Sequence, residues 1–241
     1  KHLLCLLLAL LLTGVLLAGC AADTADADAD LPVITVGCDN YPPFTYVNSD
    51  GKPVGIDVEL ADEAFRRIGY RPEFVTINWA EKNELLENGV IDCIWSSFSM
   101  SGRADEYTWV GPYMYSHQVV AVMPDSDIQT LADLAGKTVV VQATTKPESL
   151  FLDGNDPRIP EIRALHSLQK RELIYSYLAK GYADAVAAHE TSIRQFMKDY
   201  GFEFRILEEP LEAVELGVAF SKESPASSAE RLTNALNELQ S

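Results

Sequence analysis

The chain has 241 residues, 47% of them apolar, which is enough to bury one large core or the cores of two small lobes. Four cysteines and four histidines are too few for a fold held by disulfides or for a metal-rich site. A net charge of −17 without any basic run excludes a nucleic-acid-binding surface, because phosphate contacts need clustered Lys and Arg.

The N-terminus begins with Lys1 and His2 and continues without charge from Leu3 to Ala22. A helix that stays in the membrane would also contain about 20 apolar residues, so that interpretation remains open. A short basic start and an end in small residues are more typical of a secretory signal peptide. Residues 17–20 read Leu-Ala-Gly-Cys and resemble the lipobox of bacterial lipoproteins. This resemblance implies a signal peptide at 1–19, a lipid on Cys20 and an extracytoplasmic protein anchored to the cell membrane.

The segment that follows the cysteine is strongly acidic. Residues 21–30 contain four Asp and no large apolar residue. Such a composition cannot form a packed core, so we expect residues 20–30 to be an extended, solvated tether.

From Leu31 onward, strand and helix patterns alternate. Short β-branched or apolar runs predict strands, and apolar residues at helical spacing followed by Gly predict helices. In the first half we expect strands at 32–38, 73–77, 90–95 and 119–123, helices at 58–68 and 80–88, and a hairpin of 44–47 with 54–56 around the turn at 48–51.

The second half continues the same alternation. Strands are expected at 138–142, 162–165, 185–188, 203–207 and 216–220, with helices near 148 and at 168–180, 191–200 and 225–239. Repeated strand–helix alternation predicts an α/β fold of mainly parallel sheets covered by helices. Periodicity alone does not decide between one sheet and two.

The chain lacks the motifs of common enzyme classes. It contains no G-x-S-x-G elbow, no Walker phosphate loop, no G-x-G-x-x-G and no H-E-x-x-H. His117, His166 and His189 are widely separated in the sequence. The sequence therefore predicts no cofactor, no metal and no enzyme activity.

The densest group of polar residues lies at 95–103, which read Trp-Ser-Ser-Phe-Ser-Met-Ser-Gly-Arg after a predicted strand. In open α/β sheets, ligands bind beyond the carboxyl ends of the strands. Serine hydroxyls donate hydrogen bonds to anions, and an arginine can hold a carboxylate with two parallel hydrogen bonds. Arg103 is therefore a candidate carboxylate ligand. The alternative is an ordinary serine-rich loop in which Arg103 pairs with Asp105 or Glu106.

Several segments together carry a family resemblance. They lie at 36–44, 55–60, 91–103, 111–113, 131–137 and 181–185. In sequence, order and spacing they resemble the solute-binding proteins of polar amino-acid ABC importers, which have the type II periplasmic-binding-protein fold. The resemblance implies a monomeric receptor that closes on a small polar solute, an amino acid or a similar carboxylate, and delivers it to a permease and ATPase complex.

This family fold consists of two lobes, each a mainly parallel sheet flanked by helices, joined by two crossover hinge strands. By the resemblance, the first lobe would be residues 31–121 plus 216–241. The second lobe would be residues 124–208. The hinges would lie at 121–124 and 209–215.

The resemblance also implies roles for individual residues. Arg103 and the serines would hold the ligand carboxylate, the threonines would contribute from the second lobe, aromatic side chains would form the pocket wall, and Asp39 would meet a basic ligand group. Tyr41 and Trp79 have the alternative of being core or rim, and Asp39 of capping a turn. Trp95 is a bulky ring where the family often has a small or aliphatic residue. The candidate ligand-binding set is Asp39, Tyr41, Phe44, Trp79, Trp95, Ser96, Ser97, Ser99, Arg103, Thr144 and Thr145.

His189 departs from the family pattern. The family commonly has an acid at this position that receives the ligand's ammonium, whereas here His189 is followed by Glu190. A neutral imidazole accepts one hydrogen bond but stabilises an ammonium less than a carboxylate does. We therefore include both residues in the candidate site and expect a ligand that has a carboxylate but does not depend on a free α-amino group.

Two other function classes remain open at this stage. An enzyme on the same fold, such as a cyclohexadienyl dehydratase, would need an acid and a base at the cleft, and His189 with Glu190 is the one suggestive pair. An extracytoplasmic sensor domain is the third possibility.

Secretion would permit a disulfide between Cys38 and Cys93. The family's strand pairing, however, places Cys93 nearer the start of its strand and Cys38 nearer the end of its own, so two buried free thiols are expected.

Overall fold

The computed structural model describes residues 30–239. The chain divides into two units, residues 1–31 and residues 32–241, and the fold described here is that of the second unit. The predicted signal peptide, Cys20 and nearly all of the predicted tether lie outside the described residues. Among the helices that the structure describes, none has the length and apolar character needed to cross a membrane.

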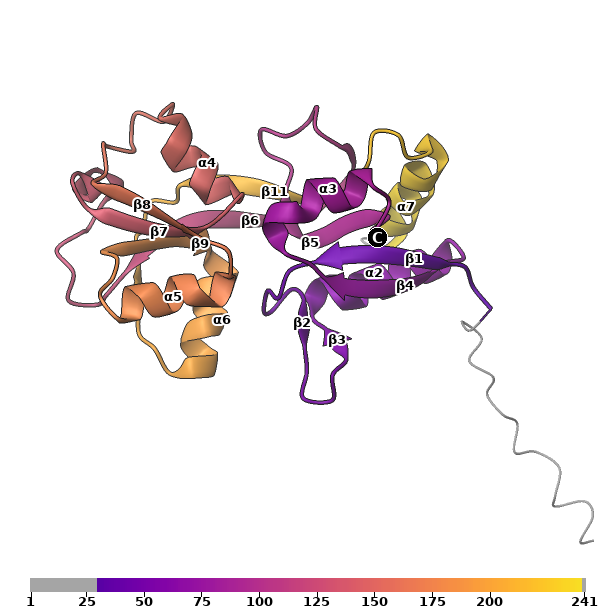
Figure 1. Cartoon of the computed structure of the whole chain (residues 1–241), viewed down its shortest axis with the longest axis horizontal. Coiled ribbons are helices and arrows are strands. Elements are labelled where there is room, and N and C mark those ends of the chain that lie inside the picture. The colour runs from indigo at the N-terminus through magenta and orange to yellow at the C-terminus, as the bar shows by residue number, and fades with distance from the viewer. Residues whose placement is uncertain (1–29, 240–241) are drawn as a thin grey trace, which may run out of the picture. The chain divides into compact units, whose positions relative to one another are not determined.

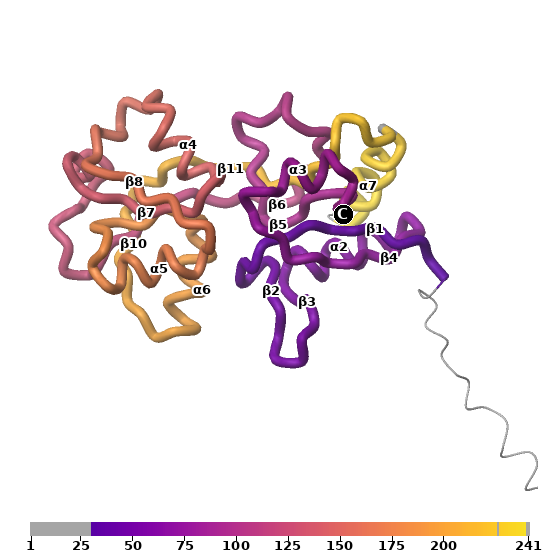
Figure 2. Tube along the Cα trace, in the orientation of Figure 1, coloured from indigo at the N-terminus to yellow at the C-terminus, as the bar shows by residue number. Residues whose placement is uncertain are grey.

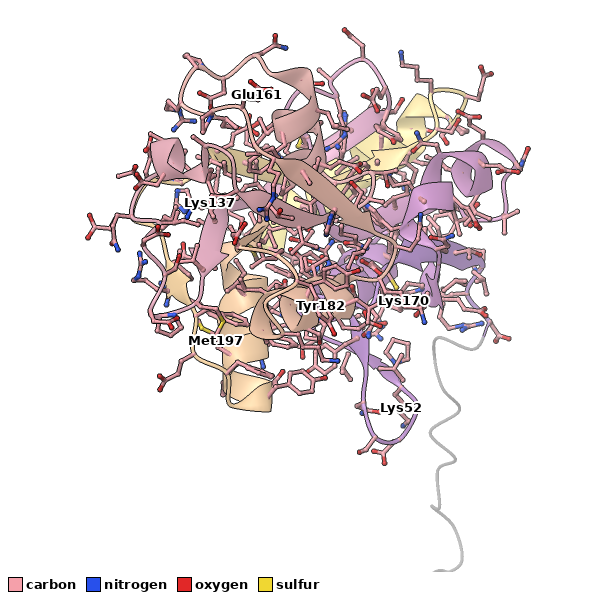
Figure 3. All side chains as sticks on the ribbon, turned by 60° about the vertical axis from the view of Figure 1, so that its left-hand side comes forward. Lys52, Lys137, Glu161, Lys170, Tyr182 and Met197 are labelled. Atoms are coloured by element: carbon pink, nitrogen blue, oxygen red, sulfur yellow. The ribbon has the colours of Figure 1, made fainter. Side chains whose placement is uncertain are left out.

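The first lobe is built on three parallel strands, with β1 in the middle and β4 and β5 on either side. A small β2–β3 hairpin extends from it, with Lys52 at its turn (Figures 2 and 3). The elements are β1 (Val33–Cys38), β2 (Tyr46–Val47), β3 (Pro53–Val54), α2 (Ile56–Arg67), β4 (Arg71–Thr76), the 3₁₀ helix η1 (Trp79–Glu81), α3 (Lys82–Glu87), β5 (Cys93–Ser99) and the closing helix α7 (Ala226–Leu239).

The second lobe repeats the scheme, with β7 between β8 and β9 and all three strands parallel. Helices α4, α5 and α6 flank them (Figure 1). The elements are the 3₁₀ helix η2 (Leu131–Leu134), β7 (Thr138–Gln142), α4 (Lys146–Asp153), β8 (Ala164–Leu168), α5 (Arg171–Ala179), β9 (Ala185–His189), α6 (Glu190–Tyr200) and β10 (Arg205–Ile206).

Two long strands run between the lobes, β6 (Thr108–Val122) and β11 (Glu212–Phe220) (Figure 1). They pair antiparallel with each other, and β11 also pairs with β5. Gln118 faces Glu212 on β11 and His189 on β9, so β6 changes its partner there. Apart from the β2–β3 hairpin, the described strands of both lobes thereby join one mixed sheet in the order β4-β1-β5-β11-β6-β9-β7-β8, with β10 on β6.

Each lobe has its own apolar core. In the first lobe, the apolar stripe of α2, with Ala61, Ala64 and Phe65, packs with Val36 of β1 and Leu232 of α7. The helix follows the sequence rule, because these residues recur on one face at helical spacing. In the second lobe, separate clusters form on the two faces of β7 and β9. The expected α/β fold with two lobes and two crossover strands is therefore confirmed.

The element boundaries differ from expectation in two places that matter for the site. The strand expected at 90–95 lies at 93–99, so the serine cluster belongs to a fully buried strand rather than to a loop after it. The strand expected at 119–123 begins already at Thr108, and its change of partner at Gln118 precedes the expected hinge at 121–124. Cys38 and Cys93 are buried free thiols, as predicted.

Candidate functional site

The carboxyl ends of β5, β7 and β9 contribute to one pocket, which we call the central pocket. It contains about 370 Å³ of space not filled by protein atoms, part of it open to solvent. Both lobes contribute to its wall, as expected for open α/β sheets. The lining residues are Trp79, Ser96, Ser97, Phe98, Ser99, Arg103, Gln118, Thr145, Lys146, Pro147, Arg171, Ala187 and His189.

The serines of β5 are held in place by contacts that the sequence did not reveal. Ser97 has a φ of 50°, a left-handed conformation that is costly for a residue with a side chain. Its backbone N–H donates to Asp57 Oδ2 at 2.6 Å, and this hydrogen bond to a fully buried carboxyl holds the strand in place there. Ser97 lines the pocket, and its buried hydroxyl has no hydrogen-bond partner in the described chain.

Ser96 and Ser99 are less free than Ser97. The Ser96 hydroxyl accepts a hydrogen bond from the backbone N–H of Asp39 at 3.0 Å and lies 3.0 Å from the Thr45 hydroxyl. The Ser99 hydroxyl accepts from the backbone N–H of Ser101 at 3.3 Å. Both line the pocket, but Ser96 also ties β5 to the loop that follows β1.

Asp57 is an acid in an apolar place. Burial raises its pKa to about 7, although the bond from Ser97 and a contact with Tyr113 act in the opposite direction. It lies on the same helical stripe as Ala61, Ala64 and Phe65. An acid on the apolar stripe of a helix is a signal in the sequence that could have identified Asp57 as a buried polar contact.

Arg103 is a half-buried cation in the pocket wall. One guanidinium nitrogen donates to the backbone oxygen of Ser99 at 3.2 Å, and the guanidinium carbon lies 5.3 Å from the centre of the Phe98 ring. Burial lowers its pKa, although the nearby Glu106, Tyr107 and Glu212 act in the opposite direction. Within the described residues it forms no ion pair, so it is not paired with Asp105 or Glu106.

The two threonines differ in their position. Thr145 lines the pocket, and its hydroxyl donates to the backbone oxygen of Gln142 at 2.6 Å. That hydroxyl therefore offers a solute its lone pairs rather than its proton, unlike the donor role implied by the resemblance. Thr144 lies outside the central pocket, where its hydroxyl accepts from Lys82 Nζ of the first lobe at 3.0 Å.

Lys146 is a second cation in the pocket wall. Its Nζ lies 3.3 Å from Glu212 Oε2, so this charge is compensated by the crossover strand β11. Trp79 completes the wall on the side of the first lobe, with an indole N–H that is buried and has no partner in the described chain.

Asp39 and Tyr41 lie behind the pocket wall rather than in it. Arg171 of the second lobe lines the pocket and contacts both of them, with its guanidinium carbon 3.4 Å from the centre of the Tyr41 ring. Tyr41 and Phe44 are fully buried and pack against His189, with ring centres 5.7 Å and 6.3 Å from the imidazole. These aromatics therefore support the pocket from behind.

His189 lines the pocket at the end of β9, but both of its ring nitrogens are engaged. Nε2 lies 2.8 Å from Gln118 Nε2, and Nδ1 lies 3.0 Å from the Ser116 hydroxyl. Burial and the nearby Arg171 lower its pKa to about 3, so the ring is neutral at physiological pH. The imidazole therefore supplies no negative charge to a ligand ammonium.

Trp95 and Glu190 are placed away from the central pocket, contrary to prediction. Trp95 is fully buried between Phe65 and Tyr113, because side chains alternate along β5 and it points to the opposite face from Ser96. Glu190 forms an ion pair with Arg194 at 2.7 Å and borders a different hollow. His189 and Glu190 consequently do not form the acid and base pair that an enzyme would need.

Residues 34–241 match the family of bacterial extracellular solute-binding proteins, family 3. The chain belongs to this family.

Individual relatives agree with the family match. The histidine-binding periplasmic protein of Salmonella typhimurium is 34% identical over 200 residues, which cover 79% of this chain and 76% of that protein. The glutamate-binding protein GluB of Corynebacterium glutamicum is 27% identical over 217 residues, covering 82% and 70%. The arginine-bound form of truncated ArgBP from T. maritima superposes with a TM-score of 0.76 at 29% identity, covering 86% and 96%. These relatives are binding proteins, and the family expected from the sequence is confirmed.

This family 3 protein has pocket residues that the sequence reading missed. Gln118 lines the central pocket and marks the change of strand partner on β6. Gln142 is not among the lining residues, but it ends β7 and donates to Asp39, so the rule about carboxyl ends of strands could have identified it. Arg171 carried no such signal. It stands between Lys170 and Glu172 at the start of a predicted helix, where charged residues are usually exposed.

Proposed function

We propose that this family 3 protein is the lipid-anchored, substrate-binding component of an ABC importer and that it captures a small solute carrying a carboxylate. The observation that carries the proposal is Arg103, a half-buried guanidinium in the pocket wall without an ionic partner among the described residues. An unpaired buried charge is costly, and a bound carboxylate removes that cost with two parallel hydrogen bonds.

The charge of the pocket supports an anionic ligand group. Three cationic side chains line the pocket, Arg103, Lys146 and Arg171, and none of its lining residues is Asp or Glu. His189 is neutral. The free Ser97 hydroxyl and the indole N–H of Trp79 can donate hydrogen bonds to the same carboxylate.

Contacts between the lobes support capture by closure. Gln142 Nε2 of the second lobe donates to Asp39 Oδ2 at 2.8 Å, and Lys82 Nζ donates to the Thr144 hydroxyl. Both contacts lie beside the central pocket, so opening the lobes would break them and expose the pocket. In this proposal β6 and β11 act as hinges, since they are the elements that belong to both lobes.

The ligands of relatives narrow the solute class. The three relatives named above are described as binding histidine, glutamate or arginine, all of which have an α-carboxylate. We therefore propose an amino acid or a related carboxylate, delivered to a permease and ATPase complex. The lipid anchor on Cys20 is proposed from residues 17–20 and places the receptor at the extracytoplasmic face of the membrane.

A thermal-shift screen tests the proposed capture. The purified chain is heated with and without L-glutamate, L-glutamine, L-arginine, succinate or glutarate, with uncharged sugars of similar size as controls. A bound solute at about 100 times its dissociation constant adds about 2.7 kcal/mol of stability. We expect at least one carboxylate and no sugar to raise the melting temperature. A chain that responds to sugars and to no carboxylate would contradict the proposal.

A further inference from the structure

Arg171 is a buried cation at the junction of the lobes. It is the first residue of α5 and is 6% exposed. Its guanidinium carbon lies 3.4 Å from the centre of the Tyr41 ring, and its Nε lies 3.4 Å from Asp39 Oδ2. The guanidinium therefore covers one face of the aromatic ring and pairs with the acid beside it. An aromatic ring next to a carboxylate binds cations well.

The carboxylate of Asp39 has its contacts within the chain. Oδ2 accepts from Gln142 Nε2 at 2.8 Å and faces Arg171, and Oδ1 accepts from the backbone N–H of Asn40 at 2.9 Å. A cationic part of a solute would need this carboxylate or the face of the Tyr41 ring. Arg171 already occupies both.

The same side chain also lines the central pocket, whereas Asp39 is not among the lining residues. A solute held by Arg103 would therefore meet a further positive charge at Arg171. No lining residue of the pocket is an acid that could offset a positive charge on the solute. Two like charges in a partly desolvated site repel each other strongly.

We propose that Arg171 is a specificity-determining residue that acts as a built-in cation and restricts the central pocket to carboxylates without a cationic side chain. This inference rests on the proposed function, because it concerns the part of the solute that Arg103 does not hold. If Arg171 had only a structural role, its loss would weaken the binding of all solutes alike and would leave the order of their affinities unchanged.

The test compares relative affinities in matched variants. Isothermal titration calorimetry measures binding of L-glutamine, L-glutamate, L-arginine and L-lysine to the wild type and to Arg171→Gln. Lys170→Gln is the matched control, since Lys170 is an adjacent, exposed cation and its loss changes the net charge equally (Figure 3). The double variant Asp39→Asn/Arg171→Gln removes the acid as well as the cation.

We expect the wild type to prefer L-glutamine or L-glutamate over L-arginine and L-lysine by at least about tenfold, or ~1.4 kcal/mol. Arg171→Gln exposes Asp39 and Tyr41, so it should shift the ratio toward the cationic amino acids by at least about tenfold, while Lys170→Gln leaves the ratio unchanged. The double variant should lose this gain, because the carboxylate that receives the cation is gone.

Failure of this inference can be separated from failure of the proposed function. Strong binding of L-arginine by the wild type, abolished by Arg103→Ala, would overturn the role of Arg171 and keep the carboxylate site. A ratio of affinities in Arg171→Gln equal to that of the wild type would also overturn the role of Arg171 and keep the carboxylate site. If Arg171→Gln does not fold, two measurements still decide whether Arg171 excludes cationic solutes. One is the ratio of affinities in the wild type. The other is the same ratio in Arg171→Lys, which keeps the charge and should keep the preference. Absence of binding of all four probes and of the carboxylates in the screen would contradict the proposed function itself.

Discussion

The guanidinium of Arg171 lies over the ring of Tyr41, with its central carbon 3.4 Å from the ring centre. The two residues come from different lobes, with Tyr41 in the loop after β1 and Arg171 at the start of α5. This contact and the Asp39 carboxylate beside it connect the lobes directly behind the central pocket. Changes at this contact should therefore affect the stability of the fold, the closure of the lobes and the charge of the solute that the pocket accepts.

The Asp39–Arg171 pair should be energetically coupled. Both side chains are nearly buried, with 13% and 8% exposed, and burial raises the pKa of Asp39. Removing one partner of a buried pair costs about 3–5 kcal/mol, because the remaining charge is left uncompensated. Urea unfolding of Arg171→Met, Asp39→Asn and the double variant should give a coupling energy of about 1–3 kcal/mol. Strictly additive effects would show that the pair contributes nothing as a pair.

Asp57 should make stability depend on pH. Its pKa is about 7 in the folded protein and 3.8 as the reference value, so the folded state holds a proton that the unfolded state loses. The wild type therefore loses stability as the pH rises through this window, and the loss is complete above the folded pKa. Asp57→Asn keeps an acceptor for the Ser97 N–H and cannot ionise. Its stability relative to wild type should rise by about 2–3 kcal/mol between pH 5 and pH 8.

Chemical denaturation at several pH values checks this difference. Comparing the variant with the wild type at each pH cancels the contribution of other titrating groups. A difference that does not change with pH would mean that Asp57 ionises in the folded protein as readily as in water.

Because His189 lines the pocket where the family commonly has an acid, we expect the α-amino group of a solute to contribute little to affinity. The ring is neutral and both nitrogens already have partners, so an ammonium meets no negative charge there. We expect glutarate, which lacks the amino group, to bind within about tenfold of L-glutamate, a difference of ~1.4 kcal/mol. His189→Asp should increase the preference for L-glutamate, and Glu190→Gln, which alters an acid outside the pocket, should not. A large preference for L-glutamate in the wild type would contradict this account of the site.

Cys20 should carry a lipid, because the residues before it resemble a lipobox. Mass spectrometry of the protein from the membrane fraction should show a chain that begins at a lipid-modified Cys20. Cys20→Ser should release the protein from that fraction. Detection of residues 1–19 on the membrane-bound protein would disprove the cleavage.

Much of the fold follows from local patterns, and much of the site does not. The alternation of apolar runs and helical stripes predicts the lobes, because each element buries one face within its own lobe. The segment 108–118 of β6 was missed because exposed Tyr115 and the Gly111–Pro112 pair interrupt its strand pattern. The serines and Arg103 were found from their position after a strand. Arg171 could not be found, because its burial depends on a loop from the other lobe.

The calorimetric titration of Arg103 variants tests the central claim most directly. The solute is the strongest carboxylate found among L-glutamate, L-glutamine, L-arginine, succinate and glutarate. Arg103→Ala should weaken binding by about 30-fold to several thousand-fold, or about 2–5 kcal/mol, because a buried partner of the carboxylate is removed. Arg103→Lys should recover only part of this loss, since an ammonium lacks the planar fork of the guanidinium. An affinity that is the same in Arg103→Ala as in the wild type would contradict the carboxylate site.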